Sequence, residues 1–133
     1  PFNILHDDSD DINVILGKNQ LMEDVIISLN KVHSYLIVGA TGGGKSVCIH
    51  NILTQLYTKY PSPKDMLFYI ADLKRVECIN YKDIVNTVRY TDNIEEANTI
   101  VDELLKICEN RHELFSETAR GIKNLAQYNQ ICI

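Results

Sequence analysis

Short apolar runs in the first third of the chain predict strands. Residues 12–16 and 25–29 are rich in β-branched side chains, and Gly17, Lys18 and Asn19 lie between them. This arrangement predicts a hairpin-like pair of strands. Residues 35–38 form a compact apolar run that ends at Gly39. Such a run is typical of a strand buried on both faces, so we expect Tyr35 in the core.

The middle of the chain predicts a helix followed by further strands. Apolar residues recur at helical spacing from Lys45 to about Tyr60, and Pro61 then ends the helix. Residues 66–71 are apolar without polar alternation, which predicts a second buried strand and completes a βαβ unit. Residues 84–88 predict a short third strand.

A long amphipathic helix follows. Asp92, with Glu95 three residues later, resembles a capping box at its start. Gly121 ends the pattern, and residues 122–128 predict one more short helix. The predicted fold is therefore α/β, with a mostly parallel sheet, flanking helices and a hairpin-like lead-in. The apolar face of the long helix comprises Ala97, Ile100, Val101, Leu104, Leu105, Cys108 and Phe115.

Composition limits the class of protein. The chain has 133 residues, of which 45% are hydrophobic and 23% charged, as expected of one globular domain. No apolar run approaches the roughly 20 residues that span a bilayer, and no signal segment opens the chain. It begins at Pro1 without Met and stops within an apolar patch at Ile133, so we expect a piece of a longer chain.

Charge and cysteine spacing exclude further classes. The formal net charge of −5 argues against binding nucleic acid by bulk electrostatics, so any such contact must be local. The cysteines lack metal-ligand or disulfide spacing, which predicts reduced, mostly buried thiols and a cytoplasmic protein. The histidines have no convergent partners and are expected at the surface or in packing. These residues are Cys48, Cys78, Cys108 and Cys132, and His6, His33, His50 and His112.

One motif carries chemistry. Residues 39–46 fit G-x-x-x-x-G-K-[ST] and lie between a predicted strand and a predicted helix. In this motif backbone N–H groups and the helix N-terminus hold phosphates. Lys45 would reach the β- and γ-phosphates, and the Ser46 hydroxyl would bind Mg²⁺. A glycine-rich turn that only closes a strand–helix corner is the alternative, but such a turn does not need Lys45 and Ser46.

Hydrolysis of a nucleotide needs a further carboxylate near the metal. Asp72 ends a predicted strand, where open α/β sheets place ligands. Asp102 and Glu103 mimic an acidic signature, but their helical pattern predicts a solvated face. The charges of residues 72–77 could face the nucleotide, a neighbouring subunit or DNA, or form a plain solvated loop.

The ordered motifs together resemble the FtsK/SpoIIIE family of DNA-translocase motors over about residues 12–128. The segments that carry the likeness are ILGK at 15–18, residues 33–46 with VCI after them, DLKRVE at 72–77, YTD at 90–92, RHELF at 111–115 and GIKN to YN at 121–129. Leu73 stands where the family usually has Pro, and Gly43 where Ser is common.

The resemblance implies a hexameric ring of RecA-like P-loop NTPase subunits. Such rings bind ATP and Mg²⁺ between neighbours and pump double-stranded DNA during chromosome segregation, sporulation or conjugative transfer. The family's Walker B strand would begin beyond Ile133, so the fragment alone should hydrolyse ATP hardly at all. By resemblance the nucleotide site comprises Gly39, Ala40, Thr41, Gly42, Gly43, Gly44, Lys45, Ser46 and Val47, with Ser46 on the metal. Because the Walker B strand lies elsewhere in the family, Asp72 is not expected in that role and stays an accessory candidate, together with Lys74, Arg75 and Glu77. Independently of the resemblance, the place of Arg75 at the carboxyl edge of a predicted strand suggests a sensor or a subunit bridge.

The resemblance also divides the chain. Residues 1–32 would be lead-in strands, and residues 33–133 a partial RecA-like ATPase domain. We expect a membrane anchor only through a segment not present in the sequence. Two other functions stay open: an ATPase of a type VII secretion or conjugative coupling system, and a non-catalytic nucleotide-binding module.

Overall fold

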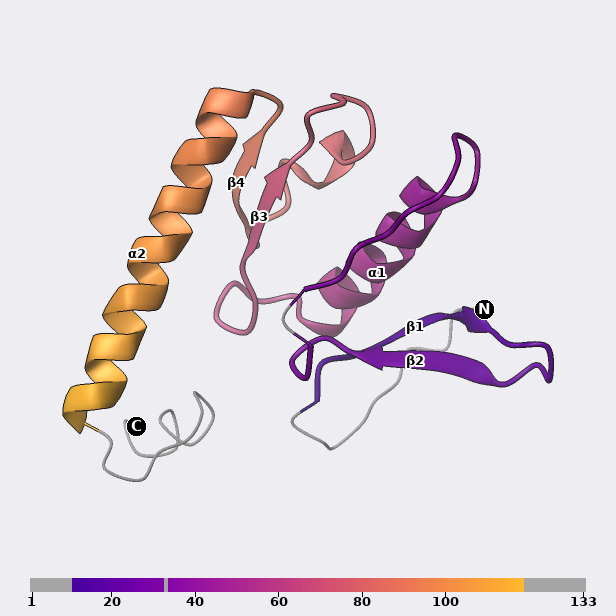
Figure 1. The fold of residues 1–133 in the computed structure, drawn as a ribbon, viewed down its shortest axis with the longest axis horizontal. Coiled ribbons are helices and arrows are strands. Elements are labelled where there is room, and N and C mark those ends of the chain that lie inside the picture. The colour runs from indigo at the N-terminus through magenta and orange to yellow at the C-terminus, as the bar shows by residue number, and fades with distance from the viewer. Residues whose placement is uncertain (1–10, 33, 119–133) are drawn as a thin grey trace.

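The computed structural model describes residues 11–32 and 34–118. These described residues form two separate strand pairs and two long helices (Figure 1). Their order is β1 (Asn13–Lys18), β2 (Asp24–Ser28), α1 (Lys45–Lys59), β3 (Phe68–Ala71), the short 3₁₀ helix η1 (Ile79–Tyr81), β4 (Thr87–Thr91) and α2 (Ile94–Thr118). The α/β class is confirmed. The helix predicted at residues 122–128 lies outside the described residues.

The first strand pair is the predicted hairpin. β1 and β2 are antiparallel, with Val14 opposite Ile27 and an irregular register between Ile15 and Gly17. The turn spans residues 19–23, where the Asn19 side chain accepts hydrogen bonds from the N–H groups of Leu21 and Glu23. Placing Gly17 and Lys18 in the turn was therefore wrong, because the asparagine supplies the turn chemistry.

The second strand pair is parallel, in agreement with the predicted mostly parallel sheet, but the predicted βαβ unit does not form, because residues 35–38 are not a strand. β3 pairs with β4, with Ile70 opposite Tyr90. β3 is buried on alternate residues, Phe68 and Ile70, so it covers one face rather than two. β4 starts three residues after the predicted position. Fully buried Asn86 occupies the preceding position and donates to the Tyr60 carbonyl, which ends the connecting loop before the strand begins.

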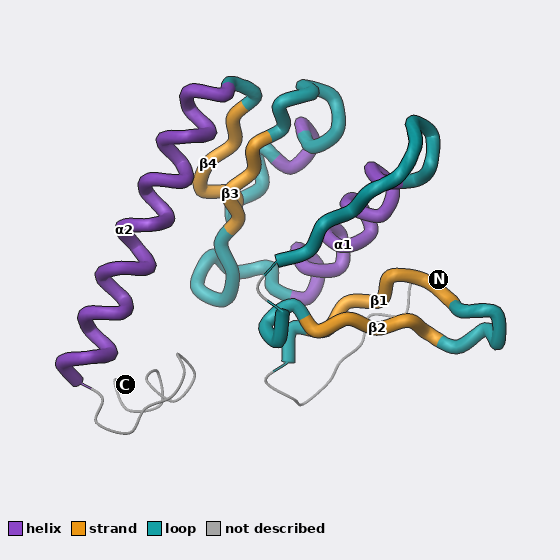
Figure 2. Tube along the Cα trace, viewed as in Figure 1, coloured by secondary structure: helices purple, strands orange, loops and turns teal. Residues whose placement is uncertain are grey.

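The predicted strand at residues 35–38 is wrong in the structure. This segment is drawn as loop throughout (Figure 2), and no strand pairs with it in the part of the chain that the structure describes. Leu36 is 88% exposed and Val38 79% exposed, and Tyr35 also lies at the surface, its hydroxyl donating to the Ser28 carbonyl. An apolar run forms a buried strand only where neighbours cover it, and β3 and β4 pair with each other instead.

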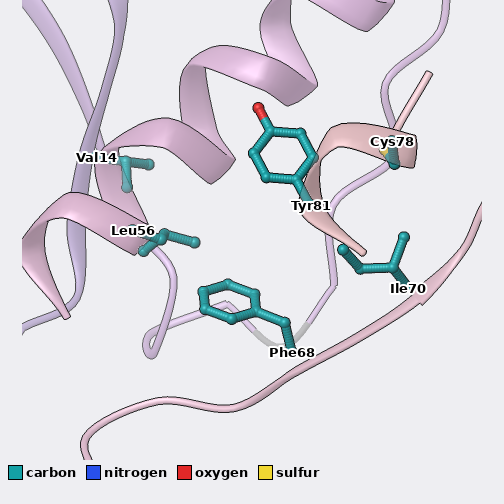
Figure 3. Packing of buried hydrophobic residues seen from close by; sticks show 6 residues of the cluster. All are labelled: Val14, Leu56, Phe68, Ile70, Cys78 and Tyr81. Carbon is teal, nitrogen blue, oxygen red and sulfur yellow. The ribbon is translucent and has the colours of Figure 1, made fainter. Parts of the chain in front are cut away.

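The core lies between β1, α1, β3 and η1 (Figure 3). Aromatic rings pack at its centre, with the Tyr57 ring centroid 4.1 Å from that of Phe68 and 5.4 Å from that of Tyr81. His50 stacks on Tyr81, so its expected packing role is confirmed. The buried apolar residues of this cluster are Val14, Leu56, Phe68, Ile70, Cys78 and Tyr81.

Helix α2 packs against β3 and β4 through part of its apolar stripe. Ile100 is buried, whereas Val101, Leu105 and Cys108 are exposed. The cap is Asn93 rather than Asp92, because the Asn93 side chain accepts hydrogen bonds from the N–H groups of Glu95 and Glu96. The register of the cap is thus one residue later than the sequence pattern indicated.

Candidate functional site

The glycine-rich loop between residues 39 and 44 turns sharply before α1. Gly42 has φ of 79° and Gly44 has φ of 81°, in the left-handed region that favours glycine. The Gly43 N–H donates to the Ala40 carbonyl over 3.0 Å. A Cβ on Gly43 would lie 2.9 Å from that carbonyl oxygen, so a side chain there would force the loop to shift.

Lys45 lies over this loop. Its ammonium donates to the carbonyls of Gly39 and Ala40, each over 2.7 Å. An ammonium carries three N–H donors, so one is left for a ligand at the mouth of the loop. The positive charge of Lys45 therefore lies directly beside the glycine-rich loop, which is an arrangement that suits an anion.

The N-terminus of α1 follows at once. Its cap, Gly44, has no side chain to cap it, and the first turn holds no acidic residue. The first helical hydrogen bond runs from the Cys48 N–H to the Gly44 carbonyl, so the N–H groups of Lys45, Ser46 and Val47 precede the intrahelical ladder. Uncapped N–H groups and the helix dipole attract anions, and the half-buried Ser46 adds a hydroxyl.

The loop that follows β3 reaches the same place. Lys74 and Glu77 line a cavity of about 310 Å³ together with Thr41, Lys45, Ser46 and other residues of the glycine-rich loop. We call this space the P-loop cavity. The Lys74 ammonium lies 3.4 Å from the Glu77 carboxylate. The structure thus brings two of the predicted accessory residues to the glycine-rich loop.

Asp72 does not line this cavity. It is 7% exposed, and its carboxylate accepts hydrogen bonds from the N–H groups of Glu77 (2.9 Å) and Cys78 (2.8 Å) and from the Tyr90 hydroxyl (3.4 Å). Burial raises the pKa of Asp72, but these hydrogen bonds outweigh burial, so the net pKa lies below its usual value. The carboxylate therefore organises the loop that carries Lys74 and Glu77. No pattern in the sequence indicated Tyr90 as a partner of Asp72.

The charges around Asp72 affect its neighbours. Burial and then the charges of Asp72 and Glu77 raise the pKa of the Cys78 thiol, which favours the neutral form. Arg75 has φ of 65°, and its side chain lies 3.4 Å from the Asp92 carboxylate in an exposed ion pair.

The remaining candidates lie elsewhere. Asp102 is exposed on α2, as expected, but Glu103 is not fully solvated, since it pairs with Arg89 of β4 over 3.1 Å. Of the described cysteines, Cys78 is buried, Cys48 is half-buried and Cys108 is exposed, and none forms a disulfide. Residues 11–32 and 34–118 hold no group of three metal-ligating side chains. Neither of the α-helices in these ranges is long and apolar enough to cross a membrane.

An α/β fold with this loop and helix belongs to the class of P-loop NTPases. Residues 3–132 match the model of the FtsK/SpoIIIE family, and the chain belongs to that family. It is 34% identical over 116 residues to DNA translocase FtsK of Oceanobacillus iheyensis, and 34% identical over 115 residues to DNA translocase SpoIIIE of Bacillus subtilis. Each match covers 86% of this chain and 14% of the relative.

DNA translocase SftA of Bacillus subtilis is 32% identical over 121 residues, which cover 90% of this chain and 12% of that protein. The chain thus spans about one seventh of the length of the curated relatives that it matches. No solved structure matches it.

Proposed function

We propose that this chain is the nucleotide-binding part of an ATP-driven translocase of double-stranded DNA. The relatives described above are all named DNA translocases, which supports DNA as the substrate. The observation that carries the nucleotide part is the loop of residues 39–44, which leads directly into an uncapped helix with Lys45 at its start.

The residues present fit Mg-ATP. The N–H groups at the start of α1 and the free donor of Lys45 would hold the phosphates, and Ser46 would hold Mg²⁺. Bound Mg²⁺ neutralises charge that develops on the phosphates during transfer. Lys74 and Glu77 line the P-loop cavity, so Lys74 would contact the terminal phosphate and Glu77 would lie beside it.

Hydrolysis also needs a carboxylate that helps to hold Mg²⁺. Glu77 lines the P-loop cavity, but its carboxylate is paired with Lys74. Asp72 is engaged by the loop after β3, and Asp102 lies exposed on α2. We therefore propose that residues 33–133 form part of a RecA-like domain, with residues 1–32 as its lead-in. The ring would be a homo-hexamer, and the remaining catalytic groups would come from outside these residues.

The test is the rate of ATP hydrolysis with and without linear double-stranded DNA, measured on the full natural polypeptide that contains these 133 residues. We expect DNA to stimulate the rate strongly, and Lys45→Ala to abolish the stimulated rate. Lys106→Ala removes an exposed lysine of α2 and is the matched control, with an expected rate close to that of the unmodified protein.

Other outcomes identify other functions. A Lys45-dependent rate that is indifferent to DNA would indicate a different cargo, as in a secretion ATPase. Nucleotide binding without any hydrolysis would indicate a non-catalytic module. An unchanged DNA-stimulated rate in Arg75→Ala would exclude Arg75 as a sensor or subunit bridge.

A further inference from the structure

A second cavity lies between β1 and α1. Its volume is about 640 Å³, and its lining is mostly apolar. Residues 15–18 of β1 form one wall, and Val47, Cys48 and Thr54 contribute to the other. We call this space the hairpin cavity. Its size and apolar lining are typical of small-molecule sites, which usually measure about 300–1,000 Å³.

The walls of the hairpin cavity are held together by side-chain amides. The Ile15 N–H donates to Gln55 Oε1 over 2.9 Å, and the Ile15 carbonyl accepts from Gln55 Nε2 over 2.8 Å. Asn51 Nδ2 donates to the same carbonyl over 2.7 Å. Gln55 is buried, so these hydrogen bonds are protected from water. The hairpin is therefore fixed to α1, and the cavity is preformed.

The hairpin cavity adjoins the P-loop cavity. Gly44 and Val47 line both spaces. In a P-loop the lysine reaches the β- and γ-phosphates, whereas backbone N–H groups hold the α- and β-phosphates. With Lys74 and Glu77 beside the P-loop cavity, the α-phosphate end of a nucleotide would lie toward Val47. The group attached to the α-phosphate would then meet the hairpin cavity.

We infer that the hairpin cavity binds the nucleoside part of the nucleotide whose phosphates the glycine-rich loop holds. This inference rests on the proposed function. The base would cover the apolar side chains of Leu16, Val47 and Cys48, of which Val47 is 71% exposed. Removing this apolar surface from water by covering it with the planar base would favour binding. The glycine-rich loop alone would supply contacts only to the phosphates. The lead-in hairpin would thus be a part of the nucleotide site.

Cysteine alkylation offers a direct test, because Cys48 lines the hairpin cavity and exposed Cys108 lies on α2. The full natural polypeptide is treated with N-ethylmaleimide, and each cysteine peptide is quantified by mass spectrometry. Saturating ADP should slow alkylation of Cys48 about tenfold, whereas inorganic tripolyphosphate, which lacks a nucleoside, should leave it almost unchanged. Cys108 should react equally in all samples.

Two outcomes would overturn the inference. Equal protection of Cys48 by ADP and tripolyphosphate would show that phosphate binding alone accounts for it. No protection, in a sample where ADP binding is demonstrated by calorimetry, would show that the nucleoside lies elsewhere or that another part of the chain fills the cavity.

A substitution separates this inference from the proposed function. Cys48→Phe places a ring in the hairpin cavity and should weaken ADP about tenfold without changing the affinity for tripolyphosphate. Cys108→Phe is the matched control and should change neither. If Lys45→Ala leaves both affinities intact, the proposed function fails. If Lys45→Ala weakens both but Cys48→Phe leaves ADP binding unchanged, only the hairpin cavity is excluded.

Discussion

At the residue scale, Asp72 shows how one carboxylate orders the loop that follows β3. Two N–H groups and one hydroxyl converge on it, and its neighbours Lys74 and Glu77 line the P-loop cavity. Replacing Asp72 with asparagine removes the negative charge that strengthens these three hydrogen bonds. We expect Asp72→Asn to lower the free energy of unfolding by about 1–3 kcal/mol, measured by urea denaturation.

The pH dependence of this loss follows from the lowered pKa of Asp72. The unfolded carboxyl has a pKa of about 3.9, and the folded one lies below it. The stabilisation is therefore complete above the unfolded pKa and is lost as pH falls through the folded pKa. The difference between Asp72→Asn and the unmodified protein should persist at neutral pH and vanish in strong acid. Asp92→Asn, at an exposed ion pair, should be close to neutral, and an equal loss there would contradict this account.

At the element scale, the contact between the hairpin and α1 depends on Gln55. Its amide satisfies both backbone groups of Ile15, which lies 40 residues away. Gln55→Ala would leave the Ile15 N–H without this partner and the Ile15 carbonyl with Asn51 alone, so we expect a loss of about 1–3 kcal/mol in urea unfolding. The matched control is Gln20→Ala, which removes the same type of side chain from the exposed turn of the hairpin. It should change the free energy of unfolding by less than about 0.5 kcal/mol. Equal effects would show that the amide does not hold the hairpin.

The same elements show what a sequence can predict. α1 was predictable because its apolar spacing, its start after glycine and its end before Pro61 all indicate the same helix. Lys45 and Ser46 were predictable because they belong to a sequence motif that is defined by its own residue spacing. The sequence left open whether Lys74 and Glu77 lie beside the glycine-rich loop, since the residues after a strand can also form a solvated turn. The hairpin cavity could not be predicted, because Gln55 reads as an ordinary polar helix residue until its partner strand is placed.

Strand boundaries were less predictable for a related reason. Residues 84–88 and 87–91 are both plausible strands by composition, and the choice depends on burial of Asn86 and its bond to Tyr60. Such a contact joins residues 26 positions apart. Local patterns contain no information on it.

At the scale of the whole molecule, the apolar run at residues 35–38 should contribute little to the free energy of unfolding, whereas the buried core should contribute much. Leu36 is 88% exposed, whereas Leu56 is 6% exposed and belongs to the cluster that joins β1, α1 and β3. Replacing each of these two leucines with alanine therefore tests which of the two side chains the folded chain buries. Leu56→Ala should cost about 2–5 kcal/mol, because it removes buried contacts and leaves a cavity.

Leu36→Ala should change the free energy of unfolding by less than about 0.5 kcal/mol, since its side chain has few contacts to lose. Both variants are compared by urea denaturation on the full natural polypeptide. A loss at Leu36 as large as that at Leu56 would mean that residues 35–38 are covered there by other parts of the polypeptide. The apolar pattern of residues 35–38 would then describe a buried strand after all, and the glycine-rich loop would start from the end of a sheet strand.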